Sequence, residues 1–156
     1  MLVLGGGDDM TTYVSNTHVD VEPEVALDQV VELMTKSFTL IEATPERVGT
    51  RYRYEMRLPG RSVGGTCTLA EYVPGEKVTF QWHGPERFTV GGLRGEWTFA
   101  PEEGGTSITV RSIFDPRIPI LHALGARLMI AGFRRVELPA MKKEMQARST
   151  GAQPAS

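Results

Sequence analysis

The sequence contains a single cysteine, Cys67, among its 156 residues. One thiol excludes an internal disulfide framework and a cysteine-rich metal site, because both need several cysteines. Histidine is almost as scarce: His18, His83 and His122 are scattered, with no helical pair of the H-E-x-x-H type. We therefore expect no metal and no cofactor, and we interpret Cys67 as a buried, inert thiol.

Long apolar runs and an excess of basic charge are also missing. No stretch approaches the ~20 apolar residues that span a bilayer, so we expect no integral membrane association. The net charge of −2 gives no general attraction to nucleic acid. Basic residues gather between 127 and 148, but they alternate with glutamates and lack an aromatic series, which is typical of a solvated helix face. The first nine residues lack the basic start and apolar stretch of a signal peptide, and we expect a cytoplasmic protein.

The length is typical of one domain, and neither a repeat nor a shift of composition divides the chain. At this size folding removes roughly 70% of the unfolded chain's surface from water, so a core forms without disulfides. Met10 is followed at once by strand-like sequence and is a second candidate start. We predict a flexible N-terminal extension over 1–10, a single domain over 11–147 and a disordered tail over 148–156.

Alternating apolar and polar residues predict most of the chain to be strands. Residues 11–22 form the first strand, and Pro23 ends it and starts a helix over about 24–36. The apolar face expected for this helix is Val25, Val30, Leu33 and Met34. Further strands are predicted over 38–43, 50–58, 66–73, 77–83, 87–100 and 106–114. Glycines at 91, 92 and 95 predict a bulge or sharp bend in the sixth of the seven strands.

The remaining sequence, from about 118 to 147, has the apolar spacing of one long helix. Its inward stripe is expected to be His122, Gly125, Met129, Gly132, Val136 and Ala140, with Phe133 widening the apolar arc. Pro139 should kink this helix or separate its last turns. A strand, a helix, six strands and a long helix together predict the α+β class.

Short motifs at the junctions of these elements are informative as a set. They are Val21-Glu22-Pro23-Glu24-Val25, Val48-Gly49-Thr50-Arg51-Tyr52, the linker Glu71-Tyr72-Val73-Pro74-Gly75-Glu76-Lys77-Val78, and Gly95-Glu96-Trp97-Thr98-Phe99 followed by Gly105-Thr106. Over about residues 12–147 the chain resembles the START-related (SRPBCC) superfamily, in its polyketide cyclase/dehydrase-like branch. The resemblance implies a helix-grip fold, in which a curved antiparallel sheet of about six or seven strands wraps around the long C-terminal helix.

The same resemblance implies an apolar cavity between the sheet and the C-terminal helix, suited to lipids, quinones, polyketides or similar molecules. Family members often carry a second short helix, commonly bearing an aromatic residue, after the first helix. Here residues 34–38 leave little room for it, so we expect one wall of the pocket entrance to be altered or more open.

The candidate ligand-binding residues are large apolar or aromatic side chains of the strands, with three residues of the C-terminal helix. They are Tyr52, Tyr54, Met56, Phe80, Trp82, Trp97, His122, Met129 and Phe133. The alternative is that these side chains are simply core, since aromatic residues dominate cores. The glycines at 125 and 132 either leave room for a ligand or let the helix approach the sheet closely.

No tight acid–base or nucleophile constellation is visible, so the catalytic residues are left unassigned. Glu71, Arg94, Glu96 and Arg111 either form a buried pair that anchors a ligand or, as we favour, pair across strands at the surface. The first hypothesis is a non-catalytic binding or transport module for a small hydrophobic or amphipathic molecule. The alternatives are a polyketide cyclase/aromatase-type enzyme and a protein-interaction module resembling the co-chaperones of this fold. No nucleic-acid partner is expected, and a weak homodimer is left open.

Overall fold

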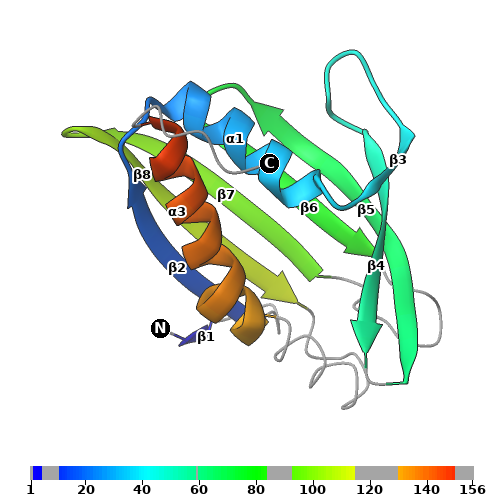
Figure 1. Ribbon diagram of the computed structural model, residues 1–156. Coiled ribbons are helices and arrows are strands. Elements are labelled where there is room, and N and C mark those ends of the chain that lie inside the picture. The colour runs from blue at the N-terminus through cyan, green and yellow to red at the C-terminus, as the bar shows by residue number, and fades with distance from the viewer. Residues whose placement is uncertain (1, 5–10, 59, 84–92, 115–129, 150–156) are drawn as a thin grey trace.

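The chain forms one strongly curved antiparallel sheet with two helices over the same face (Figure 1). This computed structural model describes residues 2–4, 11–58, 60–83, 93–114 and 130–149. The elements are β1 (Leu2–Leu4), β2 (Thr11–Val19), α1 (Pro23–Thr35), β3 (Thr39–Glu42), β4 (Arg51–Leu58), β5 (Arg61–Val73), β6 (Lys77–His83), β7 (Leu93–Glu102), β8 (Gly105–Phe114), a π-helical turn η1 (Phe133–Glu137) and α3 (Leu138–Ser149). The predicted α+β helix-grip architecture is confirmed.

The eight strands lie in the order β1-β2-β8-β7-β6-β5-β4-β3. Each strand from β3 to β7 pairs with the next in sequence, whereas β2 pairs with β8. The chain must therefore cross from one side of the sheet to the other between β2 and β3, and α1 makes this crossing over the concave face (Figure 1).

Both ends of the described chain are more ordered than the sequence analysis predicts. Leu2–Leu4, placed in a flexible extension, instead form β1 and pair with residues 11–13 of β2. Arg148, which the sequence analysis assigns to a disordered tail, lies in α3. Its guanidinium donates to both carboxylate oxygens of Glu32 at 3.1 Å. This bidentate pair joins α3 to α1.

Helix α1 begins at Pro23, whose fixed φ suits the first helical position. Its buried side chains are Ala26, Leu27, Val30, Val31 and Leu33. The predicted face was correct at Val30 and Leu33 but wrong at Val25, which is 44% exposed. Met34 is partly buried against the core, as expected, and the place predicted for Val25 is taken by Ala26 and Leu27.

The C-terminal helix contains a π-helical turn directly before Pro139. The Leu138 N–H donates to the Phe133 carbonyl, five residues earlier instead of four. In an α-helix the ring of Pro139 would clash with the Arg135 carbonyl and leave it without a donor. The wider turn accommodates the ring and inserts one residue into the helical period. Pro139 therefore distorts the helix, as the sequence predicts.

The predicted inward stripe is wrong in the described part of the helix, both before and after the π turn. Gly132 and Ala140 are exposed, and Val136 is 67% exposed. The side chains that face the sheet are those of Ile130, Leu138, Met141 and Met145, with Phe133 half-buried. His122, Gly125 and Met129 lie outside the described residues.

The sheet is irregular at different places from those expected. Register shifts occur between Leu40 and Glu42 and between Leu69 and Glu71. Gly95 pairs in regular register with Phe80 on one side and Ser112 on the other, so the bulge predicted in this strand is absent from its described part. The glycines at 91 and 92 lie outside the described residues.

Candidate functional site

Aromatic side chains of β4 and β6 gather on the concave face of the sheet. The rings of Tyr54 and Trp82 meet edge to face, with centroids 5.3 Å apart, and Phe80 lies 6.3 Å from Trp82. Phe38, from the connection between α1 and β3, packs edge to face on Trp82 at 5.6 Å and also contacts Tyr52 at 6.4 Å. These five rings, Phe38, Tyr52, Tyr54, Phe80 and Trp82, are called the aromatic cluster below.

Gly65 allows the Tyr54 ring to lie flat across strand β5. The two residues are register partners, and a Cβ on Gly65 would lie 2.5 Å from the Tyr54 hydroxyl and 2.3 Å from the His83 carbonyl oxygen. Because Gly65 has no side chain, the Tyr54 hydroxyl reaches and donates to that carbonyl at 3.3 Å. Burial, followed by the nearby Cys67, raises the pKa of Tyr54 to about 12, so the phenol stays neutral.

Cys67 lies under the aromatic cluster, paired with Tyr52 on one side and Trp82 on the other. Its side chain is fully buried, and burial raises the pKa of the thiol to about 12. A thiol that is protonated and inaccessible is a poor nucleophile. Cys67 therefore acts as a small apolar core residue.

A second aromatic contact joins the sheet to the C-terminal helix. The buried Trp97 of β7 and the half-buried Phe133 of η1 meet edge to face at 5.7 Å. Gly95, two residues before Trp97, lies on the same face of the strand. This contact fixes the helix over the middle strands of the sheet.

The two tryptophans of the chain direct their indole nitrogens toward Gly95. A Cβ on Gly95 would lie 3.7 Å from Nε1 of Trp82 and 3.9 Å from Nε1 of Trp97, which are ordinary contact distances. Among the described residues, no oxygen accepts a hydrogen bond from either indole N–H. Trp97 is buried and Trp82 is half-buried, and neither indole nitrogen is among the fully buried, unpartnered side-chain atoms of the described residues. Both N–H groups therefore keep some exposure and are available as donors.

The structure thus brings together six of the nine candidate residues on or over the concave face. They are Tyr52, Tyr54, Phe80, Trp82, Trp97 and Phe133. His122 and Met129 lie outside the described residues. Met56 pairs with Val63 in the ladder between β4 and β5, and its side chain is not among those described.

Sequence reasoning missed Phe38 and the roles of Gly65 and Gly95. The chain passes from α1 to β3 without a second helix, as predicted, and Phe38 supplies an aromatic side chain in this connection. No periodicity identifies Phe38, because it lies between elements. An interior strand glycine does indicate close approach by another group, and this signal was available at Gly65.

The charged residues left ambiguous by the sequence pair on the other face of the sheet. Glu71 accepts from Arg94 and forms an ion pair with Lys77 at 3.0 Å, and Arg94 pairs with Glu96 at 3.1 Å. The hydrogen bond from Lys77, together with the charges of Lys77 and Arg94, lowers the pKa of Glu71. Glu71, Arg94 and Lys77 are about a third exposed, so the cross-strand surface pairing that we favoured is correct.

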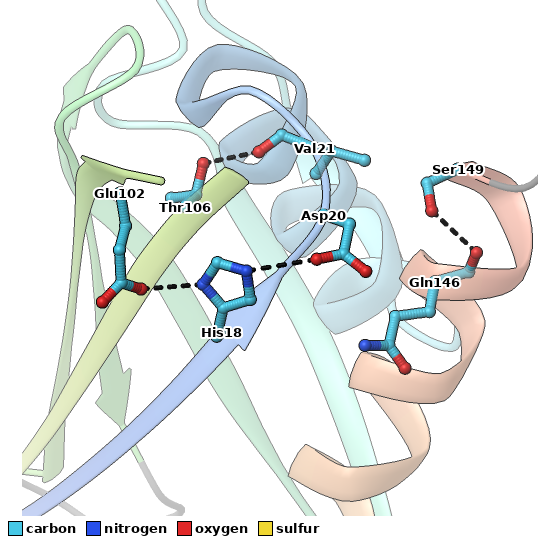
Figure 2. Close-up of polar contacts among 7 residues, drawn as sticks. All are labelled: His18, Asp20, Val21, Glu102, Thr106, Gln146 and Ser149. Atoms are coloured by element: carbon cyan, nitrogen blue, oxygen red, sulfur yellow. Dashed lines mark hydrogen bonds and ion pairs between the residues drawn. The ribbon is translucent and has the colours of Figure 1, made fainter. Parts of the chain in front are cut away.

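His18 takes part in a contact far from the aromatic cluster. Figure 2 shows its ring between two carboxylates, with Nδ1 2.7 Å from Glu102 and Nε2 3.1 Å from Asp20. Beside it the buried Thr106 hydroxyl donates to the Val21 carbonyl at 2.6 Å. These bonds fasten the β7–β8 hairpin to the end of β2 and the start of α1. Within the described ranges no group of three His, Cys, Asp or Glu side chains could hold a metal ion.

The curved sheet, the crossing helix and the C-terminal helix over an aromatic concave face define a helix-grip protein of the ligand-binding type. The chain belongs to the family described as polyketide cyclase/dehydrase and lipid transport, which it matches over residues 10–146. The resemblance inferred from the junction motifs is therefore confirmed. None of the helices in the described ranges is long and apolar enough to cross a bilayer.

Solved structures share the fold at low sequence identity. The Zhui aromatase/cyclase of a Streptomyces strain is similar with a TM-score of 0.70 and 12% identity, covering 94% of this chain and 99% of that one. Ara h 8.0201 has a TM-score of 0.65 at 13% identity, over 91% and 99% of the two chains. The Aha1 dimer from Colwellia psychrerythraea is similar with a TM-score of 0.56 and 16% identity, covering 86% of this chain and 96% of that one. No curated protein matches the chain.

Proposed function

We propose that the protein binds a small hydrophobic molecule carrying a hydrogen-bond acceptor, with its apolar body against the aromatic cluster and its acceptor oxygen in front of Gly95. The observation that carries this proposal is the pair of unpartnered indole N–H groups on Trp82 and Trp97, which converge on a residue without a side chain. Apolar sites with a few placed donors are the usual form of small-molecule sites.

Binding or transport is favoured over catalysis by the titratable groups under this face. Tyr54 and Cys67 both have pKa values raised to about 12, so both are neutral and tightly protonated near pH 7. A general acid or base works best with a pKa near the working pH. The described concave face therefore offers shape, apolar area and two fixed donors, without a poised proton carrier.

The test uses two matched probes, 1-tetralone and tetralin, which differ in one carbonyl oxygen. Because the chain has two tryptophans, its amide-correlation NMR spectrum contains two indole N–H signals, which Trp82→Phe assigns. We expect 1-tetralone to move both signals downfield as the N–H groups donate to its carbonyl, and tetralin to bind more weakly without that shift. Equal affinity for both probes with unmoved indole signals would contradict the proposal.

A variant that fills the space in front of Gly95 provides a second test. Gly95→Val should place methyl groups between the two indoles and weaken 1-tetralone about tenfold or more, as measured by the same titration. Gly95→Ala, whose methyl group fits at the observed distances, should weaken it less. Ala100→Val adds the same side chain to an exposed position of β7 and should leave binding unchanged. Unaltered binding in a folded Gly95→Val protein would show that the probe lies elsewhere.

A further inference from the structure

A separate groove of about 570 Å³ opens between β2 and the C-terminal helix. Its sheet side includes Ser15 and Thr17, and its floor includes Leu138 and Pro139. In the strand order β1-β2-β8-β7-β6-β5-β4-β3, β2 is next to one edge, whereas the aromatic cluster occupies strands at the other side. The volume is within the usual range for small-molecule sites, roughly 300–1,000 Å³.

The groove is positively charged. Arg134 and Lys142 line it, and none of its described lining residues is acidic. Within the described part of the chain neither side chain has an ion pair or hydrogen bond, although the neighbouring Arg148 is engaged by Glu32 and Glu144. Two half-buried cations without counter-charges favour an anion between them.

The π-helical turn helps to place both cations on the groove. Arg134 and Lys142 are eight residues apart, or about 12 Å along an α-helix, and Leu138 and Pro139 lie between them. A π turn rotates less per residue than an α turn, so it brings positions on either side of it closer to one face. The result is an apolar floor with a cation at each end and hydroxyls along the β2 side.

We infer that this groove binds the anionic head group, a phosphate ester or a carboxylate, of an amphipathic molecule whose apolar part lies on Leu138 and Pro139. The cations supply charge-assisted hydrogen bonds, and Ser15 and Thr17 supply neutral ones. This site is distinct from the aromatic cluster and from Gly95, and it does not depend on the function proposed above.

The test compares two double variants of equal charge. Arg134→Gln/Lys142→Gln removes both groove cations, and Arg135→Gln/Lys143→Gln removes the two exposed cations one position further along the same helix. We measure binding of decyl phosphate below its micelle concentration by calorimetry and by NMR shifts of residues 14–17. We expect the groove variant to weaken binding about tenfold or more, and the control variant to change it less than about twofold.

Three further probes identify the source of the interaction. Decanol, without the anion, should bind at least about tenfold more weakly than decyl phosphate, and inorganic phosphate, without the chain, should also bind more weakly. Phosphatidic acid vesicles should not compete more strongly than monomeric decyl phosphate. Inorganic phosphate binding as tightly as decyl phosphate, or vesicles binding tighter than the monomer, would overturn the assignment to a single amphipathic molecule.

The variants also separate this inference from the proposed function. Equal losses in the two double variants would attribute binding to the general charge of the helix and overturn the groove site. Decyl phosphate binding that is lost in Gly95→Val but kept in Arg134→Gln/Lys142→Gln would place the probe in front of Gly95 and also overturn the groove site. Loss of 1-tetralone binding in Gly95→Val alone leaves the groove site standing.

Discussion

At the scale of single residues, two glycines shape the concave face by opposite means. At Gly65, Tyr54 and the His83 carbonyl occupy the volume that a side chain would need. At Gly95 a methyl group would fit at ordinary contact distances from the two indole nitrogens. Gly65 therefore fixes the position of the Tyr54 ring, whereas Gly95 leaves the space that the proposed ligand atom would take.

Gly65→Ala should consequently destabilise the fold. The new methyl group would collide with a backbone carbonyl as well as with the Tyr54 ring, and overpacking of this kind costs roughly 1–3 kcal/mol. Urea denaturation followed by circular dichroism measures the loss. Gly64→Ala, whose Cβ would approach only the Tyr54 carbonyl at 3.2 Å, should cost less. Equal stability of Gly65→Ala and wild type would show that β6 shifts freely, contrary to the packing described.

At the scale of elements, α1 is held against the sheet by a small polar cluster beyond the edge of the aromatic cluster. The Tyr72 hydroxyl donates to Asp28 of α1 at 2.8 Å and accepts from Arg47 at 3.0 Å. Arg47 also donates to Asp28 at 3.1 Å and lies over the Tyr72 ring at 4.9 Å. Arg47 has φ of 66°, a costly conformation for a residue with a side chain, which these contacts offset.

Tyr72→Phe removes the hydroxyl while keeping the ring. We expect it to lower the free energy of unfolding by about 1 kcal/mol, because it leaves Asp28 and Arg47 paired only with each other. The matched control is Tyr52→Phe, whose hydroxyl has no partner among the described residues and whose loss should change stability little. Urea denaturation midpoints measure the loss of stability in the two variants. Equal losses in Tyr72→Phe and Tyr52→Phe would show that the Tyr72 hydroxyl contributes nothing specific.

The elements also show what sequence patterns can and cannot predict here. The alternation in 50–58 correctly predicts a strand, and its period of two puts Tyr52 and Tyr54 on one face whatever the distant contacts. The predicted face of the C-terminal helix was already wrong at Gly132, before the π turn. The turn then adds one residue to the period, and only the backbone reveals that addition. Phe38 joins the aromatic cluster through the path of the chain after α1, which no local pattern encodes.

At the scale of the whole molecule, the sheet has two faces with different chemistry. The concave face holds neutral groups under helices α1 and α3, whereas the opposite face carries the Glu71, Lys77, Arg94 and Glu96 pairs. Charge is thereby kept away from the proposed ligand site, where it would need a partner or remain unsolvated. The exception is the groove beside β2, where Arg134 and Lys142 are left available for an anion.

The neutral concave face predicts a loss of stability at alkaline pH. Burial raises the folded-state pKa values of Cys67 and Tyr54 to about 12, from ordinary values of 9.0 and 10.0. Above pH 9 the unfolded chain therefore binds fewer protons than the folded one, so the free energy of unfolding falls as pH rises from about 9 to 12. Cys67→Ala removes the thiol contribution and should make that decline shallower, whatever it costs through the small cavity that it creates.

Urea denaturation at pH 7 and at pH 10.5 measures the decline for wild type and Cys67→Ala, and the difference between the two declines cancels the cavity cost. The matched control is Val78→Ala, because it creates a small cavity under the same face without removing a titratable group. Its decline should equal that of wild type. Parallel declines in wild type and Cys67→Ala would mean that the thiol ionises as easily in the folded chain as in the unfolded one, which is incompatible with its burial beneath the aromatic cluster. A shallower decline in Cys67→Ala alone supports that burial.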